Sequence, residues 1–107
     1  MGRRSTMTTR HIQIPDGTVA RFCRRWEIRE FSLFGSVLRD DFRPESDIDV
    51  VVSFQRDAAW SLLDLATMQE ELSGILGRPV DLIEAEALRN PYRRAAILGS
   101  RQVVYAA

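Results

Sequence analysis

Two aspartates separated by one residue, Asp47 and Asp49, are the clearest chemical feature of this 107-residue chain. They begin the run from Asp47 to Phe54 (DIDVVVSF), whose β-branched residues predict a strand. Residues i and i+2 of a strand project from the same face, so the two carboxylates are predicted to stand side by side. Like charges so placed repel each other. A divalent cation such as Mg²⁺, which takes carboxylate and phosphate oxygens, would relieve that repulsion.

A third carboxylate, Asp81, lies within a short predicted strand from Val80 to Glu84. It could complete a metal site with the aspartate pair. The sequence leaves a simpler alternative open for both features. The pair could mark the exposed end of an edge strand with Asp47 as a turn or cap residue, and Asp81 could be a solvent-facing residue of an alternating strand.

Gly35 and Ser36 end another predicted strand, from Ile28 to Phe34. Glycine allows the backbone to approach a ligand closely. If Val37 and the next residue begin a helical turn, its free amide groups favour an anion, and the Ser36 hydroxyl adds a donor. One strand end is therefore predicted to hold a phosphate beside the metal ligands of a neighbouring strand.

Together these residues form the pattern G-S-x(10)-D-x-D. It resembles the signature of nucleotidyltransferases of the DNA polymerase β superfamily. The longer run GSVLRDDFRPESDIDVVV is similar to the stand-alone MNT (minimal nucleotidyltransferase) group, and the resemblance extends over residues 28–105. It implies an α/β (α+β) fold, a small nucleotidyltransferase fold with a mixed β-sheet of about four strands flanked by helices.

The resemblance also implies roles for the three carboxylates. Asp47 and Asp49 would bind divalent metal ions, and Asp81 would complete the site and help to deprotonate the acceptor hydroxyl. The expected cofactor is Mg²⁺, with two ions bound, and Mn²⁺ could replace it.

Gly35 and Ser36 would hold the triphosphate of the nucleotide, for which the resemblance implies ATP. Arg39 matches an arginine that is common in the MNT group and could pair with a phosphate; alternatively, it is a surface charge that stabilises the loop. The chain departs from the family at Asp40 and Asp41, where glycine often follows the arginine. Two more negative charges near a triphosphate are unfavourable, so this departure puts the conformation of the loop in question.

The implied reaction is an in-line displacement that transfers AMP and releases pyrophosphate. Because the chain is barely larger than a catalytic core, a partner is expected to complete the acceptor side. The resemblance implies that this partner is a HEPN-type toxin, modified on a tyrosine, with the present chain as its antitoxin. Two alternatives stay open, namely a non-catalytic module that masks the toxin and a transferase for small molecules, like the aminoglycoside nucleotidyltransferases.

Composition excludes several other classes. All 15 basic residues are arginine and 15 residues are acidic, so the net charge is zero. That balance argues against stable binding to nucleic acid or to anionic membranes. Without lysine, neither a P-loop nor a Schiff base can form.

The single cysteine, Cys23, is expected to pack in the core of a cytoplasmic protein, and no apolar run is long enough to span a membrane. Homo- and hetero-oligomers are both compatible with the sequence.

The site residues need a framework of helices and strands to position them. We predict a flexible tail over residues 1–14 and a single domain over 15–107. Apolar residues at helical spacing predict a helix that begins near Pro15 and carries Val19, Phe22, Cys23 and Trp26 on one face. The remaining expected elements are a helix over residues 58–77, a helix over 85–98 whose stable part begins at Pro91, and a strand over 102–105.

Overall fold

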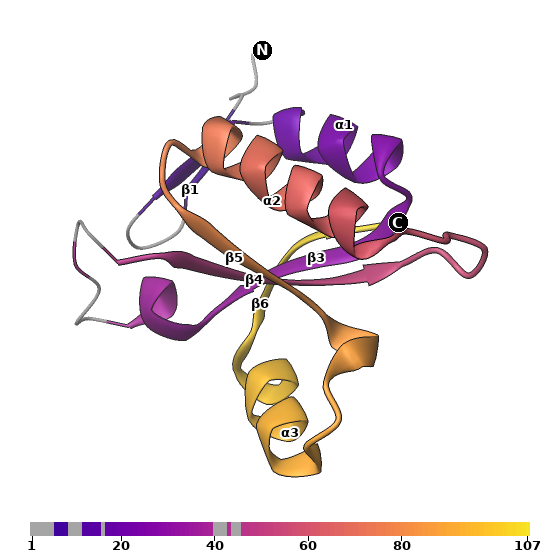
Figure 1. The fold of residues 1–107 in the computed structure, drawn as a ribbon. Helices are drawn as coiled ribbons and strands as arrows, with labels where there is room; N and C mark the ends of the chain where they lie inside the picture. The colour runs from indigo at the N-terminus through magenta and orange to yellow at the C-terminus, as the bar shows by residue number, and fades with distance from the viewer. Residues whose placement is uncertain (1–5, 9–11, 16, 40–42, 44–45) are drawn as a thin grey trace.

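The computed structural model describes residues 6–8, 12–15, 17–39, 43 and 46–107 (Figure 1). Its strands are β1 (Thr6–Thr8), β2 (Gln13–Pro15), β3 (Ile28–Phe34), β4 (Ile48–Phe54), β5 (Val80–Glu84) and β6 (Gln102–Ala106). Its α-helices are α1 (Thr18–Arg25), α2 (Leu62–Leu76) and α3 (Pro91–Ser100). Two short 3₁₀ helices, η1 (Gly35–Leu38) and η2 (Ala85–Ala87), follow β3 and β5.

Four strands form a mixed sheet in the order β5-β4-β3-β6. The central pair, β3 and β4, is antiparallel, as is the pair β3 and β6, whereas β4 and β5 run parallel. Helices α1 and α2 lie on one face of this sheet and α3 on the other (Figure 1). The predicted fold class, a mixed sheet of about four strands flanked by helices, is confirmed.

Alternating side chains of the strands build a separate core on each face of the sheet. The larger core packs under α1 and α2 and includes Ile48, Val50 and Val52 of β4. Cys23 of α1 is fully buried in it, as predicted, and burial raises the pKa of its thiol to about 12. The apolar faces of the two helices therefore pack against one face of the sheet.

The smaller core lies under α3. Its buried members are Phe34, Val51, Ala85, Leu88 and Ile97. Because side chains alternate along a strand, Val51 points to this face while its neighbours in β4 point to the other. The same alternation directs Asp49, two residues before Val51, and Asp81, two residues before the partly buried Ile83, to the α3 face.

Local sequence signals set the ends of α2. Ser61 caps the helix and Asp64 returns the hydrogen bond, so α2 begins later than predicted. Gly77 ends it with a φ of 71°. Leu62, which helical spacing places on the apolar stripe, is 83% exposed, and the fully buried residues of α2 are Met68 and Leu72.

The N-terminal segment takes more part in the fold than we predicted. Within the expected tail, β1 pairs antiparallel with β2, and Ile12 and Ile14 are buried in the larger core. The sequence did not indicate this burial, since two isolated isoleucines in a polar stretch produce no periodic signal. The other tail residues lie outside the described part of the chain, so their flexibility, like the division into domains, stays a prediction.

Candidate active site

Asp49 and Asp81 are direct neighbours in the sheet. In the parallel pair of β4 and β5, Asp49 is in register with Asp81, and across the antiparallel pair Asp49 is in register with Phe34. Neighbouring strands lie about 4.8 Å apart, and both side chains project to the α3 face. Two aspartates that the sequence only suggested as partners are therefore placed side by side.

The charges around Asp49 act on its pKa in opposite directions. Burial raises the pKa of this half-buried carboxyl most strongly, and the negative charges of Asp81 and Asp47 raise it further. Arg39 and Arg93 lower it. The charges of both other predicted carboxylates thus reach Asp49, and the net effect is a pKa of Asp49 above its ordinary value.

Asp47 is exposed and lies just before β4, which begins at Ile48 rather than at Asp47 as predicted. Arg78 holds the chain that leads to it, because Nη2 of Arg78 donates to the backbone carbonyls of Ser46 (3.0 Å) and Arg43 (2.9 Å). The Ile48 amide also donates to the carbonyl of Pro79 (2.9 Å). Sequence reasoning missed Arg78, because among 15 arginines nothing local distinguishes it.

Gly35 is required for two reasons. Its φ is 77°, a conformation that L side chains rarely adopt. In addition, a Cβ at this position would overlap with Oδ2 of Asp49. The backbone of Gly35 therefore lies against this carboxylate, whereas its predicted approach to a ligand stays a prediction.

Ser36 and Arg39 lie where the chain turns away from β3. Ser36 is half-buried in η1 and its carbonyl accepts from the Arg39 amide (2.9 Å). A hollow of about 260 Å³ opens here, lined by Gly35, Leu38, Arg39 and Ser100. Space therefore exists for a ligand group next to the predicted phosphate residues. Asp40 and Asp41, where the chain departs from the family, lie outside the described residues.

Two residues from the C-terminal third join the site without any signal in the sequence. Ser100, at the end of α3, lines the hollow beside Gly35. Arg93, in the first turn of α3, acts on Asp49 through its charge. The predicted helix ends at residue 98, but α3 continues to Ser100, which lies beside Gly35 of η1.

The carboxylate oxygens of the three aspartates are suitable ligands for a hard cation such as Mg²⁺. Among the described residues, no three acidic, histidine or cysteine side chains converge closely enough to hold an ion by themselves. Mg²⁺, however, needs only one or two carboxylates and completes its shell with water and phosphate oxygens. The neighbouring carboxylates of Asp49 and Asp81 match that requirement, with Asp47 close by.

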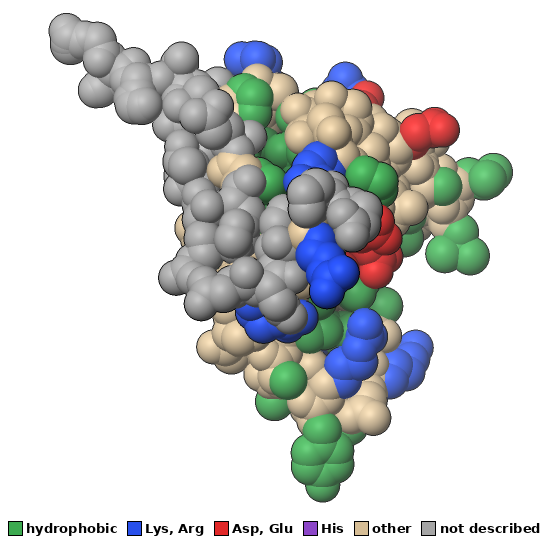
Figure 2. Space-filling view, turned by 90° about the vertical axis from the view of Figure 1, so that its left-hand side faces the viewer, with side chains coloured by type: hydrophobic (Ala, Val, Ile, Leu, Met, Phe, Trp, Pro, Cys, Tyr) green, Lys and Arg blue, Asp and Glu red, His purple; other side chains and the backbone are tan. Residues whose placement is uncertain are grey.

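Figure 2 shows the side of the molecule on which η1 and the beginning of β4 lie. Acidic and arginine side chains lie next to one another in the middle of this view.

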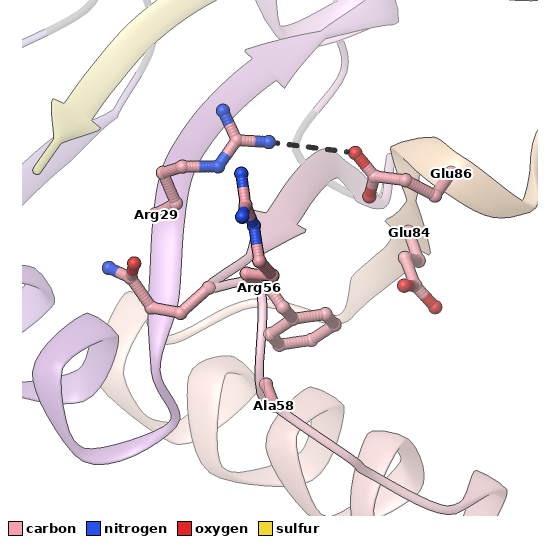
Figure 3. Close-up of a pocket in the computed structure, with 7 residues that line it drawn as sticks. Arg29, Arg56, Ala58, Glu84 and Glu86 are labelled. Carbon is pink, nitrogen blue, oxygen red and sulfur yellow. Dashed lines mark ion pairs between the residues drawn. The ribbon is translucent and has the colours of Figure 1, made fainter.

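A larger hollow, of about 630 Å³, lies at the other end of the same strands (Figure 3). It is lined by Arg29, Phe54, Gln55, Arg56, Ala58, Glu84 and Glu86. An ion pair of 3.7 Å joins Arg29 to Glu86 there, and none of the predicted site residues lines it.

Comparison with known proteins shows the family of this chain. A family model described as a nucleotidyltransferase domain matches residues 16–104. The chain belongs to this family. Protein adenylyltransferase MntA of Thermococcus cleftensis is 33% identical over 81 residues, which cover 76% of this chain and 77% of that protein. The MNT resemblance expected from the G-S and D-x-D residues is thereby confirmed.

Solved structures of the family share the fold. The structure of a "putative minimal nucleotidyltransferase" matches with a TM-score of 0.64 at 34% identity, over 78% of this chain and 83% of that one. A chain from the complex of tri-AMPylated Shewanella oneidensis HEPN toxin with MNT antitoxin matches with a TM-score of 0.61 over 83% of this chain and 67% of its own. At 16% identity the second match shows the fold alone. None of the described helices is long and apolar enough to cross a bilayer.

Proposed function

We propose that this nucleotidyltransferase is the antitoxin of a toxin–antitoxin pair and transfers AMP from ATP to a tyrosine of a HEPN-type toxin. The observation that carries the proposal is the register pairing of Asp49 with Asp81, beside Gly35, where a side chain would overlap with the Asp49 carboxylate. Relatives named protein adenylyltransferases, and a similar fold found in complex with an AMPylated HEPN toxin, support the choice of reaction and partner.

In this proposal Asp47, Asp49 and Asp81 hold Mg²⁺, with two ions expected. Bound ions would neutralise the phosphates and stabilise the departing pyrophosphate. Gly35, Ser36 and Arg39 hold the triphosphate in the hollow at η1, so that its α-phosphate lies near the carboxylates. The three aspartates carry the negative charge that attracts the ions.

The tyrosine oxygen of the partner attacks the α-phosphorus, and the bond from that phosphorus to the bridging oxygen breaks as pyrophosphate leaves. The hydroxyl proton passes to Asp81, which is exposed whereas Asp49 is half-buried. The chain supplies positioning and charge rather than a covalent nucleophile. The reaction would take place in the cytoplasm, where the partner and ATP meet.

The test is the intact mass of a co-expressed HEPN partner. We expect the wild-type chain to add the mass of one or more AMP groups, and the double variant Asp47→Ala, Asp49→Ala to add none. A matched control removes two exposed carboxylates elsewhere, Asp57→Ala and Glu70→Ala, and should keep the modification. Modification by the first double variant would contradict the assigned site.

The same variants separate catalysis from masking. If the unmodified toxin is nevertheless neutralised in cells by the Asp47→Ala, Asp49→Ala variant, the chain acts as a binding module and the catalytic proposal fails. If cells that carry the Asp47→Ala, Asp49→Ala variant fail to grow in the presence of the toxin, and the toxin is unmodified, the transfer of AMP is the neutralising step.

A further inference from the structure

Ser100, the last residue of α3, lies beside Gly35 because of the register of β6 against β3. In this antiparallel pair Leu33 is in register with Gln102. One step towards the end of β3 corresponds to one step back from the beginning of β6, so the same register continued by two residues reaches Gly35 and Ser100. Both residues line the hollow of about 260 Å³, so the chain keeps them together beyond the paired strands.

Gly35 lies between this hollow and the carboxylates. The strand order is β5-β4-β3-β6, so Asp49 approaches Gly35 from β4, whereas Ser100 approaches it from the side of β6. Two spacings between neighbouring strands amount to about 10 Å. A ligand held at both places would therefore extend from Asp49 across Gly35 to Ser100.

The end of α3 is tied to the sheet by Arg101, the residue that follows Ser100. Nη1 of Arg101 donates to the carbonyl of Leu98, and Nη2 lies 3.4 Å from Oε1 of Glu30 in β3. Both charged side chains are partly buried, so salt screens this ion pair less than a fully exposed one. Ser100 therefore has a defined position at the edge of the hollow.

The hydroxyl of Ser100 can serve as a donor in the hollow. Ser100 is exposed, and its Oγ donates to the carbonyl of Ala96 (2.8 Å), one turn earlier in the helix. A serine hydroxyl can rotate towards a better acceptor. A phosphate oxygen is such an acceptor, because hydrogen bonds to ionised groups are about twice as strong as those between neutral groups. Rotation of the side chain would turn the donor from the helix to a bound phosphate.

The other groups that line the hollow favour an anion. Arg39 contributes a guanidinium, Leu38 is apolar, and no acidic side chain among the described residues lines it. The proposed function places the α-phosphate of the nucleotide near the carboxylates, so the part of the triphosphate that reaches farthest across Gly35 is its terminal phosphate. Next to Arg39 and Ser100, this phosphate would meet a cation and a neutral donor.

We propose that the Ser100 hydroxyl donates a hydrogen bond to the γ-phosphate of the bound nucleotide, and that the end of α3 thereby helps the site to distinguish ATP from ADP. The proposal rests on the proposed function, because it needs the α-phosphate at Asp49 and Asp81. It assigns to α3 a part in substrate recognition in addition to its packing on the sheet.

The test compares the binding of ATP and ADP to the full chain in Mg²⁺, without a partner, by calorimetry. The loss of one hydrogen bond predicts that Ser100→Ala weakens ATP binding about 3- to 10-fold and changes ADP binding less than about twofold. Ser100→Asp should weaken ATP binding more than Ser100→Ala does, because a carboxylate at this position repels the γ-phosphate.

Thr67→Ala is the matched control. The Thr67 hydroxyl, in α2, also donates to the carbonyl four residues earlier, that of Leu63 (3.0 Å), but α2 lies on the face of the sheet opposite to α3 (Figure 1). This variant removes the same kind of bond and should bind both nucleotides like the wild type. A thermal unfolding curve for each variant establishes that it is folded.

The outcomes separate this inference from the proposed function. Equal ATP affinity of Ser100→Ala and the wild type would overturn the contact with the γ-phosphate and leave the proposed function standing. An equal loss of ATP and ADP affinity would also overturn it, because Ser100 would then contact a part that both nucleotides share or maintain the site as a whole. If the wild type binds no nucleotide, the proposed function fails and the inference with it.

Discussion

Asp49 and Asp81 occupy paired positions of neighbouring parallel strands, and both side chains face α3. Like charges placed opposite each other in a sheet are destabilising. The surrounding β4 is mostly apolar and buried, so this pair is an electrostatic conflict within a stable framework. Residues that reduce stability in this way are expected where a bound cation supplies the missing positive charge.

The first prediction concerns the effect of this conflict on stability. The pKa of Asp49 is raised above the ordinary value of 3.8 by burial first and then by Asp81 and Asp47. The folded state therefore binds this proton more tightly than the unfolded state, and stability is lost as the pH rises through the folded pKa. Removing the charge with Asp49→Asn should raise the melting temperature at pH 7 by about 1 to 6 °C.

The measurement is thermal unfolding with a chelator present at pH 7 and at pH 4. The gain of the Asn variant should shrink at the lower pH, because the wild-type carboxyl then begins to be protonated. Asp57→Asn, in an exposed turn, is the control and should show no comparable gain. A lower melting temperature for Asp49→Asn at pH 7 would contradict the prediction.

The second prediction concerns the metal. Mg²⁺ that binds only the folded protein raises the free energy of unfolding, by about 1.4 kcal/mol when the ion is at ten times its dissociation constant. The melting temperature therefore rises with the Mg²⁺ concentration. We expect this rise for the wild type and its loss in Asp49→Asn and Asp81→Asn. A titration followed by differential scanning fluorimetry checks it, and an equal shift in all three proteins would place the ion elsewhere.

The third prediction separates the two reasons for glycine at position 35. Gly35→Ala combines a strained φ, which costs about 1–2 kcal/mol, with an overlap with the Asp49 carboxylate. Gly77 also has a positive φ, of 71°, but a Cβ there meets nothing within 4 Å. Gly77→Ala should therefore lose only stability, whereas Gly35→Ala should also lose AMP transfer.

The comparison requires unfolding curves in denaturant and transfer rates for both alanine variants. Gly74→Ala lies inside α2, where an added Cβ would meet nothing within 4 Å; it serves as a reference and should be neutral or slightly stabilising. Full activity of Gly35→Ala would show that the close approach to Asp49 has no catalytic importance.

The fourth prediction concerns Arg78, which binds the carbonyls of Arg43 and Ser46 just before Asp47. Arg78→Ala leaves these acceptors without their charged donor and should destabilise the fold by about 1–3 kcal/mol. Asp47 would then be held less well, so a higher Mg²⁺ concentration should be needed for half-maximal transfer. Arg56→Ala, an exposed arginine remote from Asp47, is the control. An unchanged Mg²⁺ requirement in Arg78→Ala would exclude this positioning role.

Much of the framework could be predicted from local patterns. The apolar runs and their turn residues predicted β3 and β5 at their observed bounds, and Pro91 marked the start of α3. The spacing of Gly35, Ser36, Asp47 and Asp49 indicated the chemistry, because a turn and an adjacent strand carry these residues within a short stretch of chain.

The relations between distant segments were decided by the tertiary structure. The register of β4 against β5 makes Asp81 the neighbour of Asp49, and the approach of β3 to β4 brings Gly35 against the same carboxylate. The packing of α3 on the second face of the sheet brings Ser100 to the hollow beside Gly35. Periodicity in a sequence records which face of an element is apolar, but not which elements meet or in what register. Those depend on strand order and on the packing of side chains far apart in the chain. The sequence could therefore suggest Asp81 but not its register with Asp49, and it carried no signal for Ser100.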